Sequence, residues 1–331
     1  MTSTALEDRF QAPTGWRWHH FKNNGRSLRF GTASPAHSIP DAVVVCLEGL
    51  SEFGEKYFEV ARDCLSKNMA FWVLDWAGQG RSSRYLRNSQ KRHSQGFHHD
   101  VEDLHAFIMG YIKHSSVHPD RGRIPLVMLA HSTGGNIGLH YLKQYPGIFE
   151  CAAFSAPLLG LKGTQSIPSS LLMILAEGLR LVGNSSFLPG QTRWSPQTRI
   201  NSSPELFSAD PVRRTVHNVW FLSDPELQVG GITNGWLYHA IKSCAALNKK
   251  DVLEGIGIHC LLALAEREPF VDNARIREAA RRLPHARLLE LPGSHHEIMM
   301  ETDSVRKAFL DAFFTLIHER ILQRPETLKP F

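Results

Sequence analysis

Residues 129–135, Leu-Ala-His-Ser-Thr-Gly-Gly, contain the residue types needed for nucleophilic catalysis by a serine. The segment is close to the pattern G-x-S-x-G, in which a serine lies in a sharp turn between a strand and a helix. Ala130 replaces the first glycine of the pattern, and Gly134 and Gly135 supply the remaining room that the turn requires. The spacing therefore predicts that Ser132 is a nucleophile at the end of a buried strand.

A serine hydroxyl needs a general base because it is a poor nucleophile at neutral pH. Residues 292–297, Pro-Gly-Ser-His-His-Glu, follow the last expected strand and contain two adjacent histidines. His296 is favoured as the base because it directly precedes the sequence Glu-Ile-Met. His295 is the alternative, and it would otherwise be a loop side chain near the rim of the pocket.

An acidic side chain must orient the histidine, and it is expected after the preceding strand. Residues 264–273 offer three candidates, Glu266, Glu268 and Asp272. Glu268 is favoured. Asp272 stands where a helix is expected to begin, and aspartate at such a boundary usually caps the helix. A glutamate can hold the imidazole tautomer as an aspartate does, although its longer side chain must fold back.

Two backbone N–H groups must bind the negatively charged oxygen of a tetrahedral intermediate. Thr133 follows the nucleophile and is expected to supply one of them. Leu50, in the Glu-Gly-Leu sequence after an early strand, is expected to supply the second. Gly49 allows this backbone to turn inward, although an ordinary strand-ending turn is the alternative interpretation of the Glu-Gly pair.

Short apolar runs that alternate with segments of helical period must position these residues. Strands are predicted at residues 16–21, 26–33, 42–47, 70–74, 126–130, 151–155, 259–265 and 286–291. Helices are predicted at residues 53–66, 99–114, 134–144, 235–247, 272–282 and 302–318. The sequence Asn-Asn-Gly at 23–25 predicts a hairpin between the first two strands. The alternation predicts an α/β fold with a mostly parallel sheet of eight strands.

The alternation stops between about residues 158 and 224, where Ser, Pro, Gly and Asn surround one apolar helix at 169–181. Because the pattern resumes afterwards, residues 158–230 are predicted to be a helical cap inserted into one core formed by 1–157 and 231–331. The apolar helix is expected to line an acyl-chain groove, to touch a membrane surface, or to pack on the sheet domain.

The composition of the 331 residues, 42% hydrophobic and 21% charged, is that of a globular protein and excludes disordered and fibrous classes. The net charge of +5 comes from scattered basic residues, so no nucleic-acid partner is predicted. Five widely spaced cysteines indicate free thiols in a reducing compartment. Because a secretory signal and long apolar stretches are absent, the sequence predicts a cytoplasmic protein whose membrane contact would be peripheral.

Two other motifs match known binding patterns only in part. Residues 78–83, Gly-Gln-Gly-Arg-Ser-Ser, lack the third glycine of a dinucleotide-binding loop. The adjacent histidine pairs lack the i, i+4 spacing of H-E-x-x-H, so no metal site is predicted. The predicted chemistry needs no cofactor, because serine, histidine, acid and backbone amides supply the nucleophile, the base and the charge stabilisation.

The sequence resembles serine hydrolases of the α/β-hydrolase fold, and more narrowly their lysophospholipase and monoacylglycerol-lipase branch, over roughly residues 40 to 315. Residues 49–53, Gly-Leu-Ser-Glu-Phe, are similar to that branch's oxyanion loop. Residues 75–82 are similar to its Asp-x-x-Gly-x-Gly-x-Ser loop, and residues 294–297 to its His-Glu loop.

Two residues depart from the pattern of that branch. Glu48 stands where monoacylglycerol lipases usually have His, which favours the lysophospholipase side of the branch. Glu268 replaces the usual Asp.

The resemblance implies hydrolysis of a lipid monoester, such as a lysophospholipid or a monoacylglycerol. Ser132 would attack the carbonyl, His296 would accept its proton, Glu268 would orient the imidazole, and the N–H groups of Leu50 and Thr133 would bind the oxyanion. A short-chain carboxylesterase, or an amidase or peptidase, on the same triad is the alternative enzyme. A catalytically silent hydrolase fold that binds a ligand or a partner is the alternative of another class.

Overall fold

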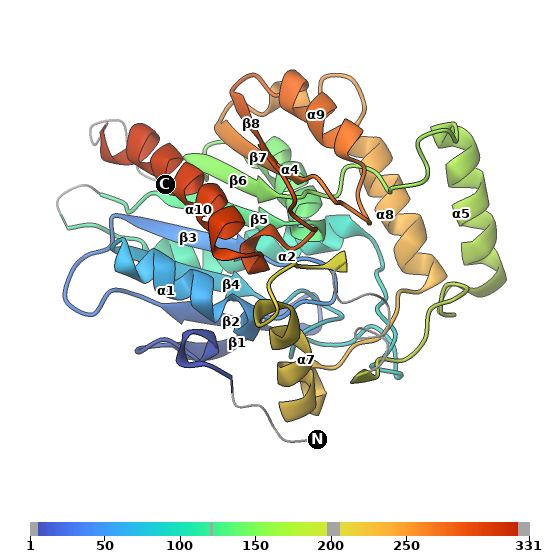
Figure 1. Cartoon of the computed structure of the whole chain (residues 1–331), viewed down its shortest axis with the longest axis horizontal. Helices are drawn as coiled ribbons and strands as arrows, with labels where there is room; N and C mark the ends of the chain where they lie inside the picture. Colours follow the sequence, from blue (N-terminus) through green and yellow to red (C-terminus); the bar gives the residue numbers. More distant parts are fainter. Residues whose placement is uncertain (1–5, 120–121, 197–205, 324–331) are drawn as a thin grey trace.

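A computed structural model describes residues 6–119, 122–196 and 206–323 (Figure 1). One sheet contains eight strands in the order β1-β2-β4-β3-β5-β6-β7-β8. The strands are β1 Arg17–Asn23, β2 Arg26–Ala33, β3 Ala42–Leu47, β4 Met69–Leu74, β5 Leu126–His131, β6 Cys151–Ser155, β7 His259–Ala265 and β8 Ala286–Leu291. The β1/β2 and β2/β4 pairs are antiparallel and the other pairs are parallel, so the predicted fold class is confirmed.

The burial of the central strands explains why the sequence pattern predicted them. Every residue of β3, β4, β5 and β6 is buried, as expected for parallel strands covered by helices on both faces. The first two strands form the predicted hairpin, in which Asn24 and Gly25 have φ values of 46° and 76°. Two consecutive left-handed residues are what the tight hairpin turn favours for Asn-Gly.

Helices cover both faces of the sheet, with α1 and α10 on one face and α2 and α4 on the other (Figure 1). The α-helices are α1 Phe58–Ser66, α2 Phe97–Phe107, α3 Lys113–Ser115, α4 Thr133–Gln144, α5 Ser169–Gly183, α7 Arg213–Ser223, α8 Asn234–Leu247, α9 Asn273–Arg282 and α10 Asp303–Ile317. Short 3₁₀ turns lie at Asp8–Phe10, Gly54–Tyr57, Pro225–Leu227, Leu253–Gly255 and Ile298–Met300, and π-helical turns at Ile108–Ile112 and His318–Leu322.

Three helical segments differ from the prediction. The helix expected over 53–66 begins as the 3₁₀ turn Gly54–Tyr57, and the helix expected over 99–114 contains the π-helical turn Ile108–Ile112. Helix α7 was not predicted at all. Its buried residues include Arg213, His217 and Asn218, so polar residues interrupt the apolar face that would have revealed it.

Between β6 and α8 the chain leaves the sheet. Helix α5 packs along α8 at one margin of the molecule, and α7 lies near the first described residues (Figure 1). Phe10, Val216 of α7 and Met300 form a small buried apolar cluster of their own. In the part of the chain that the structure describes, no helix is long and apolar enough to cross a membrane.

Candidate active site

Ser132 lies in the turn between the end of β5 and the start of α4. Its φ of 50° and ψ of −113° place a non-glycine residue in the left-handed half of backbone space, which is rare. A Cβ atom at Gly134 would lie 2.3 Å from the carbonyl oxygen of Leu47 and 2.6 Å from that of Glu48. The first turn of α4 therefore lies directly against the backbone at the end of β3, and only glycine fits there.

The structure brings Ser132, His296 and Glu268 together. The His296 Nε2 atom lies 3.0 Å from Ser132 Oγ, and its Nδ1 atom lies 2.7 Å from Glu268 Oε2. A proton on Nδ1 that is donated to the carboxylate leaves Nε2 free to accept the serine proton. All three residues are buried, and Glu268 is only 1% exposed.

The environment of Glu268 keeps its carboxyl group ionised. Burial would raise the pKa of Glu268, but the charge and hydrogen bond of His296 hold the pKa below its ordinary value. The backbone N–H groups of Phe270 and Val271 also donate to Glu268 Oε1, at 2.8 and 3.2 Å. Hydrogen bonds to the charged form favour that form, so Glu268 can orient the imidazole as a carboxylate.

The alternative acids have other partners. Asp272 caps α9 as predicted, because its Oδ1 accepts a hydrogen bond from the N–H of Ala274 at 2.9 Å. The Oε2 atom of Glu266 accepts a hydrogen bond from the N–H of Gly293 at 2.6 Å on the exposed side of the loop. Neither carboxylate has a hydrogen bond to the histidine beside Ser132.

The alternative base, His295, is directed at a different carboxylate. Its Nδ1 atom lies 2.9 Å from Glu301 Oε1, and its backbone N–H donates to the same oxygen at 2.8 Å. Of the two adjacent histidines, His296 is therefore the one within hydrogen-bond distance of Ser132.

The two amides expected to bind an oxyanion lie in tight turns. Residues 49–52 turn sharply, with a φ of 60° at Ser51 and a 3.4 Å hydrogen bond from the N–H of Glu52 to Gly49 O. Within the described residues, the N–H groups of Leu50 and Thr133 donate no hydrogen bond to the chain. Both donors therefore remain available to a ligand.

A buried charge cluster beneath these loops was not anticipated from the sequence. Lys56 Nζ lies 2.5 Å from Glu52 Oε1 and 2.7 Å from Glu297 Oε1. The other Glu52 oxygen accepts hydrogen bonds from the Gly49 N–H and the Tyr57 hydroxyl, at 2.6 and 2.5 Å. One buried ammonium group thus links the turn that carries Leu50 to the residue after His296. The i, i+4 spacing of Glu52 and Lys56 was the only sequence signal for it.

Two further buried groups flank the site. The ring of His131 lies 4.8 Å from the ring of His296, and burial lowers the pKa of His131 to about 4. Burial, followed by the neighbouring Asp75, raises the pKa of Glu48 well above its ordinary value. Gln79 Nε2 donates a hydrogen bond to Glu48 Oε2 at 3.2 Å. Among the described side chains, no group of three or more His, Cys, Asp or Glu could hold a metal ion.

Comparisons with known proteins identify the family of this chain. The family model described as Hydrolase_4, serine aminopeptidase S33, matches residues 38–303. Lysophospholipase L2 of Escherichia coli (strain K12) is 31% identical over 284 residues, which cover 82% of this chain and 79% of that protein. Human monoglyceride lipase is 25% identical over 174 residues, which cover 52% of each chain.

Solved structures show the same fold. A soluble variant of monoglyceride lipase from Saccharomyces cerevisiae matches with a TM-score of 0.72 at 17% identity, covering 93% of this chain and 97% of that one. A carboxyl esterase from Bacillus coagulans matches with a TM-score of 0.69 at 14% identity, covering 93% and 100%.

Proposed function

Because this chain belongs to the serine aminopeptidase S33 family of α/β hydrolases, we propose that Ser132, His296 and Glu268 are its catalytic triad. The chain is a carboxylic ester hydrolase of the lysophospholipase and monoacylglycerol-lipase type. The continuous hydrogen-bonded arrangement of Glu268, His296 and Ser132 is the observation that carries the proposal.

The reaction proceeds by acyl transfer. Ser132 Oγ attacks the ester carbonyl while His296 Nε2 takes the hydroxyl proton, and the N–H groups of Leu50 and Thr133 stabilise the resulting oxyanion. His296 then protonates the leaving alcohol. Water attacks the acyl-enzyme, His296 accepts a proton from that water, and the proton returns to Ser132 as the fatty acid leaves. Glu268 stays ionised and stabilises the imidazolium in both halves of the reaction.

We infer that the substrate is a lipid monoester, with a lysophospholipid favoured over a monoacylglycerol. The Escherichia coli relative supports this order, because it is more identical and matches over more of its length than the human monoglyceride lipase. A short-chain carboxylesterase and an amidase or peptidase remain the alternative activities of the same triad.

We also propose that residues 158–230 form a cap whose helix α5 contacts a lipid surface. Large apolar side chains that are exposed in the described chain concentrate on this helix. On α5 they are Leu171, Ile174, Leu175, Leu181 and Val182. Val182 is 90% exposed. An amphipathic helix with such a face can bury it at the interface of a membrane. All five cysteines are free and buried, which supports a reducing, cytoplasmic location.

The test of the triad is labelling with a fluorophosphonate probe and mapping of the modified residue by mass spectrometry. We expect the wild-type protein to be labelled at Ser132 and the Ser132→Ala variant to be unlabelled. A folded wild-type protein that the probe leaves unmodified would count against the triad and favour the silent binding fold.

The substrate class is tested by comparing kcat/KM for lysophosphatidylcholine, monoacylglycerol and p-nitrophenyl esters of increasing chain length. We expect the long-chain lysophospholipid to be hydrolysed most efficiently. A preference for acetate or butyrate esters would favour the short-chain carboxylesterase, and cleavage of amides in preference to esters would favour the amidase.

A further inference from the structure

A segment of the proposed cap forms hydrogen bonds with the loop that carries His296. Three hydrogen bonds join residues 207–209, which precede α7, to residues 297–301. They run from Glu297 N to Phe207 O (2.9 Å), from Ser208 Oγ to Met300 O (2.6 Å) and from Ala209 N to Glu301 Oε1 (3.1 Å). Residues 297–301, which follow the proposed base, are therefore held by a segment that lies outside the sheet core.

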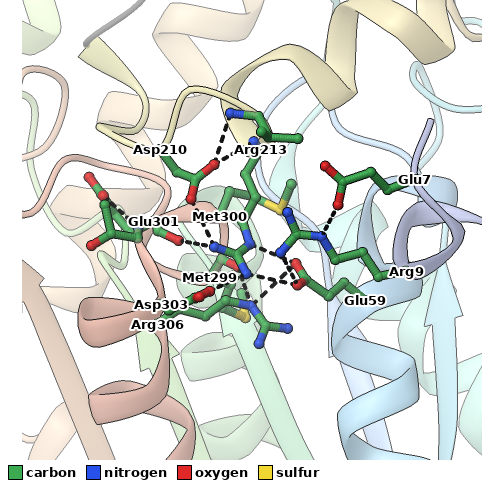
Figure 2. Close-up of polar contacts among 12 residues, drawn as sticks. Glu7, Arg9, Glu59, Asp210, Arg213, Met299, Met300, Glu301, Asp303 and Arg306 are labelled. Carbon is green, nitrogen blue, oxygen red and sulfur yellow. Dashed lines mark hydrogen bonds and ion pairs between the residues drawn. The ribbon is translucent and has the colours of Figure 1, made fainter. Parts of the chain in front are cut away.

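Arg213, the first residue of α7, anchors this segment (Figure 2). The side chain is 2% exposed, and each of its five N–H groups has an acceptor. These acceptors are the two Glu59 carboxylate oxygens at 2.8 Å, Asp303 Oδ1 at 2.6 Å, Asp210 Oδ2 at 3.0 Å and Glu301 O at 2.9 Å. Because Glu59 belongs to α1, one guanidinium group joins the cap segment, the core and the end of the histidine loop.

The charges around Arg213 keep this anchor ionised. Burial alone would lower the pKa of Arg213, but the hydrogen bonds to Glu59 and Asp303 raise it above its ordinary value. Glu59 is shared with two more arginines, since Arg9 Nη1 lies 3.3 Å and Arg306 Nε 3.5 Å from its oxygens (Figure 2). A planar guanidinium that meets carboxylates in this way fixes orientation as well as charge.

The anchored segment, residues 207–209, contacts Glu301 and Phe270, which in turn contact His295 and His296. Glu301 Oε1 accepts from Ala209 and also from the backbone N–H and Nδ1 of His295. The ring of Phe207 lies 5.2 Å from that of Phe270, whose ring in turn meets the His296 ring edge-on at 5.1 Å. The position of the imidazole therefore depends on where residues 207–209 lie.

We propose that Arg213 is a positioning residue for His296. By fixing the start of α7 to α1 and to residues 301 and 303, it couples docking of the cap segment to the geometry of the proposed base. This inference rests on the proposed triad. It gives the cap a role in the chemical step, in addition to the proposed contact of α5 with lipid.

The experiment compares Arg213→Met, Arg213→Lys and the matched variant Arg214→Met from the same helix. The readouts are the rate of Ser132 labelling by the fluorophosphonate and the steady-state hydrolysis of p-nitrophenyl acetate, a substrate too small to need lipid contacts. We expect Arg213→Met to lower the labelling rate and kcat by about 10- to 100-fold with little change in KM, because small displacements of catalytic groups cost this much. Arg213→Lys should recover part of the loss, and Arg214→Met should behave as wild type.

Folding is measured separately by circular dichroism, with activity assayed well below each midpoint of unfolding. If Arg213→Met does not fold, Ser208→Ala removes the bond to Met300 O and the bond that Ser208 Oγ accepts from the Asp210 N–H, and it should still lower kcat severalfold. A folded Arg213→Met protein, or a Ser208→Ala protein in its place, that is labelled at the wild-type rate would overturn the inference and leave the triad intact. A wild-type protein that is not labelled at Ser132 would overturn the proposed function first, and this inference with it.

Discussion

Left-handed backbone conformations cluster beside Ser132. Six non-glycine residues in the described chain have a positive φ. Three of them, Ser51, Ser132 and Ala156, follow the neighbouring strands β3, β5 and β6. Each such residue costs of order 1–3 kcal/mol, which the surrounding structure must offset. The strained residues therefore lie after the ends of three neighbouring strands, beside the proposed nucleophile and the amides proposed to bind the oxyanion.

The role of Glu268 can be tested by a nearly isosteric change. Glu268→Gln should lower kcat for p-nitrophenyl butyrate by about 10³- to 10⁴-fold, as loss of the orienting carboxylate does in serine proteases, because the amide no longer enforces the tautomer or stabilises the imidazolium. The same assay on Glu266→Gln is the control and should give wild-type kcat. A larger loss in Glu266→Gln than in Glu268→Gln would reverse the assignment.

The buried ammonium group predicts a large effect on stability. Lys56→Met leaves the carboxylates of Glu52 and Glu297 buried without their cation, and breaking a buried pair in this way costs about 3–5 kcal/mol. Urea unfolding should show this loss, while the exposed Lys67→Met should change the free energy of unfolding by less than about 0.5 kcal/mol. Equal stabilities of the two variants would mean that the ion cluster does not hold the loops.

Burial of His131 predicts a pH dependence of stability. Its pKa is lowered from 6.5 to about 4, so the unfolded chain takes up this proton first as the pH falls. The free energy of unfolding contributed by His131 is therefore lost between about pH 6.5 and pH 4. His131→Gln should thus destabilise the protein by about 2 kcal/mol less at pH 5 than at pH 7 in urea unfolding. His20→Gln on the exposed strand β1 is the control, and an identical cost of His131→Gln at both pH values would contradict the argument.

At the scale of elements, the approach of α4 to β3 positions the nucleophile. Gly134 in the first turn of α4 lies against the backbone of Leu47 and Glu48. Glycine is needed there for space, since its φ is not in the left-handed region. By contrast, a Cβ atom at Gly178 in α5 would meet no atom within 4 Å.

These two glycines predict opposite effects of the same substitution. Gly134→Ala should lower stability by about 1–3 kcal/mol through overpacking and slow the labelling of Ser132, because α4 must move away from β3. Gly178→Ala should leave labelling unchanged and stabilise the protein by up to about 1 kcal/mol, because alanine is the better helix former. Thermal unfolding measures the stability of both variants, and probe labelling measures the reactivity of Ser132. Normal labelling of Gly134→Ala would refute the packing argument.

The sequence was informative where one local property decides the structure. Continuous apolar runs predicted β3 to β6, because strands buried on both faces need apolar residues at every position. Helix α7 was missed because its buried face contains polar residues such as Arg213, whose partners include Glu59 of α1 and Asp303. The Lys56 cluster was missed for the same reason, since Glu297 reaches it only after the sheet has assembled. Local patterns predict elements, whereas buried charges depend on tertiary neighbours.

At the scale of the whole molecule, the proposed contact of α5 with a lipid surface would combine net charge with an exposed apolar face. The net charge of +5 would attract anionic lipids, and salt would screen this attraction. The apolar side chains of α5 would add a contribution that salt does not screen. In Figure 1, α5 stands at the margin of the molecule, where a flat surface can reach it.

Vesicle binding tests this arrangement. Sedimentation with phosphatidylcholine vesicles containing phosphatidylglycerol should show about tenfold weaker binding for Leu175→Glu and for Val182→Glu, because each loses the burial of one apolar side chain. Val117→Glu replaces an exposed valine outside the cap and should bind as wild type. If all three variants bound alike, α5 would not be the contact.

The order of the strands along the chain has a consequence for biosynthesis. Ser132 follows β5, whereas Glu268 and His296 follow β7 and β8, the last two described strands along the chain, and β8 is at the edge of the sheet. A nascent chain therefore carries its nucleophile long before it carries the base that activates it. On the proposed mechanism, ester hydrolysis begins only after β8 has emerged from the ribosome and docked. Synthesis beside a membrane would thus leave the surrounding lipids intact until His296 is in place.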